Sequence, residues 1–373
     1  METVIVRKSS YDYSTLRPLV FDMLEAVGTL KITDGSSVLI KPNLLAPAKP
    51  EKAVTTHPLV VRAVCEYVLL CGGRPIIADS PAIGSFRRIL KECGYREALE
   101  DLDVDCRPFE NGSQTDIGKP FGGVEIARCA LETEIVINLA KLKTHTQMLL
   151  TLGVKNLFGC ILGFQKPEWH MRSGVDRYMF ARLLVQIHKA VNPTVTLIDG
   201  ILAMDRQGPG KGGRPRDVGI LIAGARAPAT DAAVCHLLGI PVDHLLTNKA
   251  ARELGMLDQE PKLVGDFAPI EGFELPELGP LSFGPKRLRK SLRKHLIQRP
   301  AVNREKCRLC GECWQYCPAK AISPYEKAIG FDYDRCIRCY CCIEVCPHGA
   351  LAAVETIPGR LLRRLTRLGG SGR

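Results

Sequence analysis

Short runs of β-branched or wholly apolar residues alternate with helical patterns through the first 285 residues. Such runs are typical of buried strands in a mainly parallel sheet. The predicted strands are Thr3–Val6, Ser37–Ile40, Pro75–Ala78, Ile135–Leu139, Val195–Ile198 and Val218–Ala223. The predicted helices are Ser14–Val27, Pro58–Leu70, Phe86–Leu99, Arg177–Ala190, Thr230–Leu238 and Val242–Leu254. The alternation predicts an α/β fold in which helices flank a mainly parallel sheet.

The composition changes beyond this pattern. Residues 261–285 contain five prolines and few periodic apolar positions, and a basic run follows them, so the sequence predicts a linker there. Nine of the sixteen cysteines then fall between Cys307 and Cys346. We therefore expect an α/β domain at residues 1–260, a linker at 261–299, a cysteine-rich domain at 300–356 and a basic tail at 357–373.

The overall composition is that of a globular protein, with 46% hydrophobic and 24% charged residues among 373. No apolar run approaches the roughly 20 residues of a membrane span. At the N-terminus, Thr3–Val6 is followed at once by Arg7 and Lys8, which is too short a run for the core of a signal peptide. The sequence therefore predicts a cytoplasmic protein with no transmembrane segment.

The net charge of +11 is concentrated in two segments. Nine Lys or Arg lie between Lys286 and Lys306, and five Arg lie between Arg360 and Arg373 without an acidic residue. Because the basic residues are confined to these segments and not spread over one face of the α/β domain, nucleic-acid binding by that domain is not expected. Two alternatives stay open: a solvated linker and tail, or docking to an acidic surface, whether a partner protein, anionic lipid or RNA. Leucines at helical spacing in Arg360–Leu368 fit a peripheral membrane contact.

The C-terminal cysteines follow one spacing twice. Cys307-x2-Cys310-x2-Cys313-x3-Cys317-Pro318 is repeated as Cys336-x2-Cys339-x2-Cys342-x3-Cys346-Pro347. In this spacing the fourth cysteine of each run binds the neighbouring cluster. We therefore predict two [4Fe–4S] clusters, one held by Cys307, Cys310, Cys313 and Cys346 and the other by Cys336, Cys339, Cys342 and Cys317. Zinc is the alternative, but structural zinc sites use pairs of C-x2-C and need no third equally spaced cysteine.

Residues 300–356 resemble the dicluster bacterial ferredoxins. Besides the repeat, they contain Ala321-Ile322 after the first Cys-Pro and Gly349-Ala350-Leu351 after the second. The resemblance implies a small α+β domain with the element order βαββαβ, one electron per cluster, and a redox partner protein. Cys341 lies between ligands and is predicted to be a spare thiol.

Polar residues follow the predicted strands of the α/β domain. Lys41 follows the second strand, Asp79 the third, Lys141–Thr146 the fourth and Asp199 the fifth. Ligands of open α/β sheets bind beyond the carboxyl ends of the strands, so we expect these residues to meet at one edge. Lys143 and His145 are separated by one residue of an extended segment and therefore share a side. The candidate catalytic residues are Lys143, His145, Lys41, Asp79 and Asp199.

These residue types suit a small anionic ligand, because lysine supplies fixed charge and histidine titrates near neutrality. Structural alternatives stay open for each. His145 could cap the helix near Met148–Leu152 and Lys143 could lie in solvent. Asp79 and Asp199 could cap the helices that follow them. Lys41 precedes Pro42, which favours an extended turn. The residues beside such a turn could be polar only because the turn is exposed to water.

The same segments resemble the family of domain of unknown function 362, whose members are found fused to or beside ferredoxin modules. The resemblance covers about residues 2–260. It implies the fold and the fusion partner but no substrate, because the activity of the family is unsettled. The residues that carry it are Lys41-Pro42-Asn43-Leu44, Asp79-Ser80-Pro81, Lys141–His145, Lys155–Gly159, Asp199-Gly200-Ile201, Met204, Gly208-Pro209, Gly212 and Asp231-Ala232.

The segment Gly208–Gly213 matches the dinucleotide-binding pattern G-x-G-x-x-G, but the elements around it differ from those that the motif requires. A dinucleotide fingerprint leaves a strand directly and opens a helix, whereas this loop leads into another predicted strand. With Arg206, Lys211, Arg214 and Arg216 nearby, two alternatives stay open: a turn that wraps a phosphate or carboxylate, and a surface loop.

Two functions from different classes fit the sequence. The first is an iron–sulfur oxidoreductase that passes single electrons to or from a small acidic or phosphorylated ligand at the sheet edge. The second is a redox or assembly adaptor, in which the clusters serve a separate enzyme docked through the basic segments. The many polar residues at strand ends favour the first function.

Overall fold

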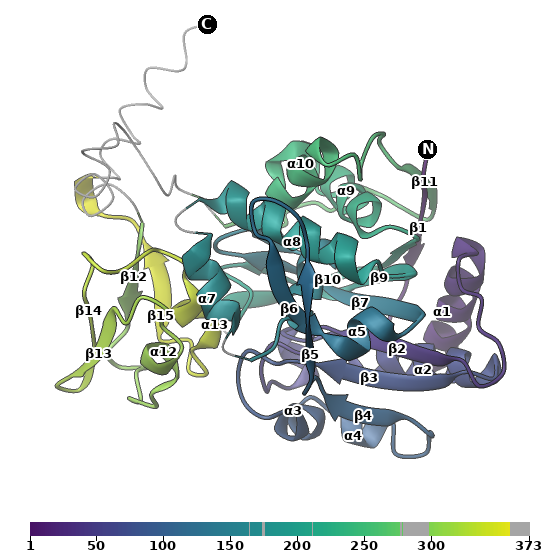
Figure 1. Ribbon diagram of the computed structural model, residues 1–373, viewed down its shortest axis with the longest axis horizontal. Helices are drawn as coiled ribbons and strands as arrows, with labels where there is room; N and C mark the ends of the chain where they lie inside the picture. The colour runs from purple at the N-terminus through teal and green to yellow at the C-terminus, as the bar shows by residue number, and fades with distance from the viewer. Residues whose placement is uncertain (164, 174–175, 211, 277, 279–297, 359–373) are drawn as a thin grey trace, which may run out of the picture.

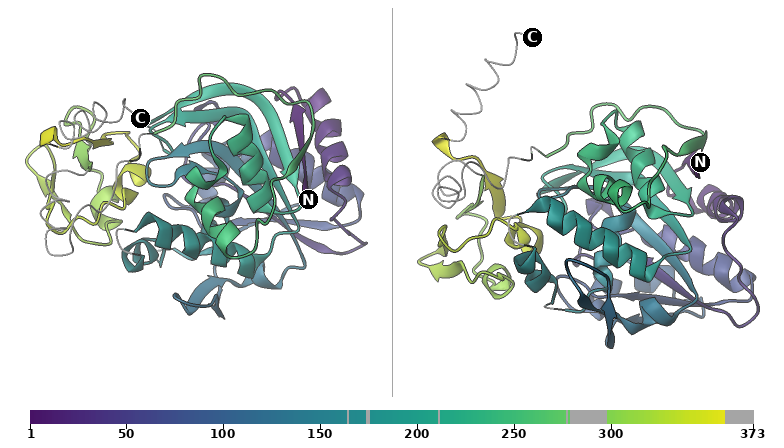
Figure 2. Two further views of the ribbon diagram at one scale, coloured as in Figure 1. Left: turned by 90° about the horizontal axis from the view of Figure 1, so that it is seen from above. Right: turned by 45° about the horizontal axis from the view of Figure 1, so that its top comes forward.

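The computed structural model describes residues 1–163, 165–173, 176–210, 212–276, 278 and 298–358, and the structural statements below concern these residues. They form a large α/β body and a smaller C-terminal module that lies against one end of it (Figure 1). Both views of Figure 2 show the module at the same end. Most of the predicted basic run and the whole basic tail from residue 360 lie outside the described residues.

A nine-stranded mixed sheet forms the centre of the body. Its strands are β1 (Thr3–Lys8), β2 (Ser37–Pro42), β3 (Arg74–Asp79), β4 (Asp105–Pro108), β7 (Ile135–His145), β8 (Leu149–Thr151), β9 (Val195–Arg206), β10 (Gly213–Gly224) and β11 (Lys262–Gly265). The order is β11-β1-β10-β9-β7-β2-β3-β4, and β8 pairs with β7. The five neighbouring strands from β9 to β4 are parallel, whereas β10 is antiparallel to β9 and β1. The predicted mainly parallel α/β sheet is therefore confirmed.

Helices cover both faces of this sheet (Figure 1). One face is covered by α1 (Tyr13–Val27), α2 (Pro58–Leu70), α3 (Phe86–Glu92) and α4 (Tyr95–Ala98). The opposite face is covered by α5 (Arg128–Glu132), α8 (Arg177–Val191), α9 (Ala227–Leu237) and α10 (Leu246–Glu253). In α1 the side chain of Asp12 caps the N-terminus by accepting from the backbone N–H of Ser14, and Gly28 at φ 69° ends the helix.

The central strands are apolar on both sides because they are buried on both sides. In β2, Val38 and Ile40 pack into the core under α1 and α2, whereas Leu39 packs into the opposite core. The same alternation holds for Ile137 and Val136 of β7. Burial on two faces explains why these strands appear in the sequence as continuous hydrophobic runs.

Several element boundaries differ from the sequence prediction. The helix predicted over Phe86–Leu99 is broken into α3 and α4, because Gly94 adopts φ 76° between them. Strand β11 lies at Lys262–Gly265, where a linker is predicted, and pairs with β1. The prediction also missed a hairpin of β5 (Gly112–Asp116) and β6 (Gly123–Ala127) and a helix, α7 (Gln165–Arg172). The sequences of β5 and α7 are too polar for the hydrophobic pattern to reveal them.

The C-terminal module contains β12 (Arg299–Val302), α12 (Glu312–Gln315), β13 (Ile322–Tyr325), β14 (Ala328–Phe331), α13 (Cys341–Val345) and β15 (Leu351–Val354). This is the βαββαβ order that the resemblance to dicluster ferredoxins implies. β12 pairs with β15 and β13 with β14, both antiparallel. Two similar halves are therefore placed around one small core.

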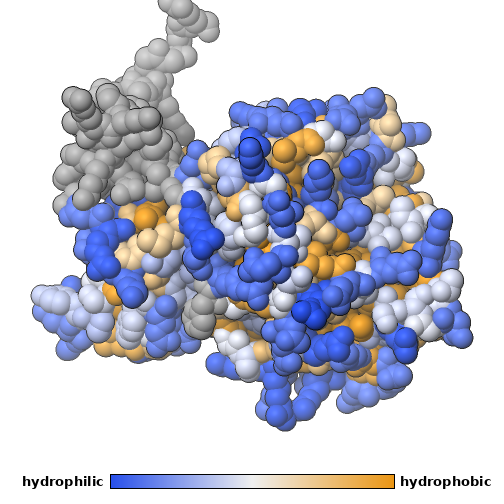
Figure 3. Space-filling model, in the orientation of Figure 1, coloured by the Kyte–Doolittle hydropathy of each residue, from blue (hydrophilic) through white to orange (hydrophobic). Residues whose placement is uncertain are grey.

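The described residues contain no helix long and apolar enough to span a membrane. On the face shown in Figure 3, hydrophilic residues predominate and hydrophobic residues are exposed in separate patches.

Candidate functional site

A cavity of about 80 Å³ lies where the C-terminal module meets the α/β body. The body contributes residues at the carboxyl ends of β2, β3 and β7, together with β8, α6 (Gly153–Asn156), the 3₁₀ turn η2 (Leu157–Cys160) and α7. The module contributes Tyr316 and three residues of α13, namely Cys341, Glu344 and Val345. Since one buried water needs about 10–15 Å³, the cavity has room for a small molecule.

Lys41 and Asp79 form a buried ion pair in the wall of this cavity. The Lys41 Nζ lies 3.0 Å from the Asp79 Oδ1, and both side chains are almost fully buried. Asp79 also accepts from the backbone N–H groups of Leu44 and Ser80, whereas the helix that follows it, α3, is capped by Ser85, so Asp79 is not a helix cap. Gly159 lies against this pair, and a Cβ there would fall 2.4 Å from the Asp79 Oδ1. Glycine at 159 therefore lets the backbone pass the ion pair.

Three lysines line the cavity without an ion-pair partner among the described residues: Lys143, Lys155 and Lys166, which we call the cavity lysines. Lys143 donates to the Asn43 Oδ1 at 2.7 Å and to the Val54 carbonyl at 2.6 Å. Lys166 donates to the Ser80 carbonyl at 2.6 Å. The ammonium of Lys155 instead lies 5.6 Å from the ring centre of Phe158.

Burial makes the cavity lysines poor cations. Burial, with the nearby charge of Lys155, lowers the pKa of Lys143 to about 7. Burial also lowers the pKa of Lys166 to about 8, although Asp79 opposes the shift. The pKa of Lys155 is lowered by burial as well. An anion placed among these groups would restore their charge, because an opposite charge nearby favours the protonated form.

His145 joins the body to the module. Its Nδ1 accepts from the backbone N–H groups of Gln147 and Met148, so the neutral ring carries its proton on Nε2. Nε2 lies 2.9 Å from the Glu344 Oε1 of α13, in a close contact rather than an aligned hydrogen bond. Burial and Lys155 lower the pKa of His145 to about 4. Burial alone would raise the pKa of Glu344, but His145 and Lys155 lower it to about 2.

Several buried polar atoms around the cavity have no hydrogen-bond partner within the described residues. They include the Thr151 Oγ1 and the His170 Nδ1, both from residues that line the cavity. Buried polar atoms without a partner are rare in folded proteins and indicate a missing water, ion or ligand. The cavity thus combines room, unsatisfied donors and acceptors, and a surplus of lysine over carboxylate.

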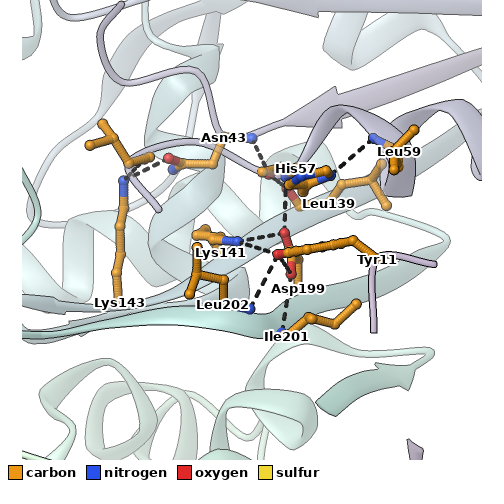
Figure 4. A network of polar contacts seen from close by, with 12 residues as sticks. Tyr11, Asn43, His57, Leu59, Leu139, Lys141, Lys143, Asp199, Ile201 and Leu202 are labelled. Atoms are coloured by element: carbon orange, nitrogen blue, oxygen red, sulfur yellow. Dashed lines mark hydrogen bonds and ion pairs between the residues drawn. The ribbon is translucent and has the colours of Figure 1, made fainter. Parts of the chain in front are cut away.

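Asp199 lies outside this cavity, in a second buried group that we call the Asp199 network (Figure 4). The network consists of Asp199, Lys141, Tyr11 and His57. The Lys141 Nζ lies 2.7 Å from the Asp199 Oδ2, and Asp199 also accepts from the Tyr11 hydroxyl and the His57 backbone N–H. The ring of His57 stacks on Tyr11 at 3.6 Å between centroids. Every oxygen of Asp199 is occupied by a partner from the chain itself.

The glycine-rich loop connects strand β9 to strand β10. The sequence predicts such a connection, because a dinucleotide-binding turn would lead into a helix instead. Its arginines are paired: Arg206 with Glu274, and Arg214 with Asp205 and Glu274. Gly208 packs on Thr144 and donates to its hydroxyl at 3.1 Å. A Cβ at Gly210 would meet the Glu344 carbonyl at 3.0 Å. This loop therefore packs against the module, and Lys211 lies outside the described residues.

The eight repeated cysteines line two further small cavities within the module. One is lined by Cys307, Cys310, Cys313 and Cys346, and the other by Cys317, Cys336, Cys339 and Cys342. These are the two sets that the crossover spacing predicts. Within the described residues, no three His, Cys, Asp or Glu side chains are arranged to hold a single metal ion. The backbone N–H groups of Ala321 and Ala350 each donate at 3.3 Å to the sulfur of the cysteine before proline, Cys317 and Cys346.

Four of the five candidate residues from the sequence line the cavity: Lys41, Asp79, Lys143 and His145. β7 extends to His145, so Lys143 and His145 belong to the strand and are buried, not exposed in a loop. The sequence analysis missed Lys166 and His170 because α7 has no hydrophobic pattern. It missed Glu344 because nothing in the sequence indicates that α13 faces the body.

Residues 38–236 match the family described as domain of unknown function (DUF362), and residues 295–350 match a 4Fe-4S dicluster domain. The thylakoid-associated protein sll1697 of Synechocystis sp. is 35% identical over 303 residues, which are 79% of this chain and 94% of that protein. The dicluster segment is 43% identical over 56 residues to the pyruvate synthase subunit PorD of Thermotoga maritima, covering 15% of this chain and 57% of the subunit.

One solved structure, the lactate racemase apoprotein of Thermoanaerobacterium thermosaccharolyticum, aligns with a TM-score of 0.39 and 14% identity. The alignment covers 59% of this chain and 54% of that one.

Proposed function

Because the chain belongs to the DUF362 family and carries a 4Fe-4S dicluster domain, we propose that it is an iron–sulfur oxidoreductase. In this proposal two [4Fe–4S] clusters pass single electrons to or from a small acidic or phosphorylated ligand in the cavity. One observation carries it: the same cavity is walled by the cavity lysines of the body and by the cysteine-bearing helix α13 of the module.

The cysteine sets fit the clusters they would hold. Each set of four lines its own cavity, and each cavity includes three cysteines from one run and the last cysteine of the other. When bound, the clusters would supply one-electron chemistry. The protein's own residues would bind and orient the ligand: Lys143, Lys155 and Lys166 by charge, and His145 by its Nε2 proton.

The first test is anaerobic purification with iron and sulfide analysis and EPR spectroscopy during a redox titration. About eight iron atoms per chain, four for each cluster, are expected. Zinc in place of iron would end the proposal.

The second test concerns the ligand. Reduced protein is mixed with a panel of small carboxylates and phosphate esters, and cluster oxidation is followed by absorbance. Lys143→Ala and His145→Ala should abolish the oxidation that the wild type shows while keeping both clusters. Lys49→Ala, which removes an exposed lysine, is the matched control and should behave as the wild type.

A second candidate function is a redox adaptor for a separate enzyme. It is favoured by the dicluster relatives, which are subunits of larger oxidoreductases such as PorD of pyruvate synthase. In that case Lys143→Ala would be silent, and deletion of residues 286–297 would abolish electron transfer to the partner.

The location that we propose is cytoplasmic, with a peripheral membrane contact through the basic tail. The relative sll1697 is named as thylakoid-associated, which supports such a contact. Flotation with vesicles that contain anionic lipid tests it. The full chain should float at low salt, and a chain ending at residue 357 should not.

A further inference from the structure

We infer that the two cluster sites act in series, with one facing solvent and the other facing the ligand cavity. The inference rests on the proposed function, since both cysteine sets must hold [4Fe–4S] clusters. The outer site is the set Cys307, Cys310, Cys313 and Cys346. The inner site is the set Cys317, Cys336, Cys339 and Cys342.

The inner site shares a wall with the ligand cavity. Cys341 lines both the cavity between the domains and the cavity of the inner cysteines. Sequence adjacency does not separate the sites, because Tyr316 and Val345 both line the ligand cavity and precede Cys317 of the inner site and Cys346 of the outer site. The residues that line the outer site include none that line the ligand cavity. Cys341, predicted to be a spare thiol, thus lies between the inner site and the ligand cavity.

The two sites differ in their exposure to solvent. Cys310 of the outer site is exposed, and its neighbour Leu309 is 37% exposed. Two cysteines are buried in each site, and the remaining inner cysteines, Cys317 and Cys336, are half-buried, so the difference lies at Cys310. We therefore expect a donor protein in solution to approach the outer site at Cys310.

A buried arginine distinguishes the inner site electrostatically. Arg338, in the loop between Cys336 and Cys339, is 0% exposed and has its guanidinium 5.0 Å from the centre of the Tyr333 ring. Among the described residues, none of its three guanidinium nitrogens has a hydrogen-bond partner. The equivalent position in the outer loop is Leu309, and Arg308, one position earlier, is exposed and screened by water.

An unscreened cation beside a cluster stabilises its reduced, more negative state. The inner cluster should therefore have the higher reduction potential. With both sites loaded, the outer cysteines would hold the cluster that takes one electron from a donor protein, and the inner cysteines would hold the cluster that receives that electron beside the cavity. No bond is formed or broken in these steps.

The test is an EPR-monitored redox titration of the anaerobically purified protein, with and without a soluble dysprosium chelate that speeds the spin relaxation of exposed clusters. The wild type should show two midpoint potentials, and the cluster of higher potential should be the less affected by the chelate. Equal potentials, or a higher potential for the chelate-sensitive cluster, would overturn the inference without any variant.

Three variants sharpen the test. Arg338→Gln should lower only the higher potential, Arg338→Lys should largely restore it, and the matched Arg308→Gln should change neither. A shift of both clusters by Arg338→Gln, or an equal shift by Arg308→Gln, would contradict the series. Failure to find two clusters would remove the proposed function together with this inference, whereas two clusters in the reverse order would remove the inference alone.

Discussion

Two groups of buried charges lie at the same edge of one sheet, yet they differ in whether their charged groups are paired with one another. The Asp199 network is complete: Lys141, Tyr11 and the His57 backbone satisfy the carboxylate, and neither Lys141 nor Asp199 lines the cavity. The cavity lysines surround empty space, lack ion pairs among the described residues, and lie near unsatisfied atoms such as the His170 Nδ1.

The comparison shows that burial and charge alone do not mark a functional site. Lys141 and Lys143 are two residues apart on the same strand and are equally buried. One is bound to a carboxylate of its own chain and supports the fold. The other is held by neutral oxygens of Asn43 and Val54 and has no carboxylate partner among the described residues.

The largest effect is expected from Asp199→Ala. The substitution leaves the Lys141 ammonium buried without its counter-ion. We expect this to lower the free energy of unfolding by about 3–5 kcal/mol. Anaerobic urea denaturation measures it. Asp199→Asn, which keeps the shape and one of the two acceptor oxygens, should cost less. A loss below about 1 kcal/mol for Asp199→Ala would show that the Asp199 network does not support the fold.

Gly159→Ala should have the second largest effect on stability. The added Cβ would lie 2.4 Å from the Asp79 Oδ1 and 2.6 Å from the Lys41 Nζ. Overpacking of this kind costs about 1–3 kcal/mol, and the displaced ion pair should also narrow the cavity. Denaturation and anion titration measure the two effects. Gly330→Ala is the control, because its new Cβ would have no neighbour nearer than 3.6 Å. Equal stability of the two variants would contradict the close approach.

Lys143→Met should weaken anion binding about tenfold or more, since it removes a charge-assisted contact worth about 1.5–3 kcal/mol. Calorimetric titration with sulfate, whose charge is constant near neutral pH, measures it. The stability of the protein should not fall, because the variant no longer buries an ammonium without a counter-ion. A large loss of stability with unchanged sulfate affinity would instead assign Lys143 to the fold, like Lys141.

The smallest effect is the pH dependence of sulfate binding. Burial lowers the pKa of Lys143 to about 7, so below that pH the lysine is already charged and the affinity should be constant. Above it, binding must take up a proton, and the affinity should fall by at most about tenfold per pH unit. Above about pH 8, Lys166 must take up a proton as well, so the fall should steepen there. In Lys143→Met the fall should begin about one pH unit higher. An affinity that rises with pH would contradict the assignment.

The sequence alone predicts a large part of this arrangement. The hydrophobic runs predict the central strands because those strands are buried on both faces. The residues after them, Lys41 and Asp79, meet because parallel strands end at one edge. The cysteine spacing predicts the two sets that line the two cavities in the module, because ligand spacing is a local property of the chain.

The remainder depends on tertiary structure. Lys141 and Lys143 have the same residue type and similar neighbours, and only the structure shows that Asp199 reaches the first and not the second. Lys166 lies on a short, mostly polar helix, and Glu344 reaches the site only because the module docks there. Arg308 and Arg338 are both loop arginines in the sequence, and their difference in burial follows from the packing of the module.

The most direct measurement of the central claim, that the cavity couples an anion to the clusters, is an EPR-monitored redox titration with and without saturating sulfate. An anion beside the wall at Cys341 should stabilise the oxidised cluster, so sulfate should lower one midpoint potential in the wild type and change it less in Lys143→Met. Unchanged potentials in the wild type, or the same shift in both proteins, would contradict the account.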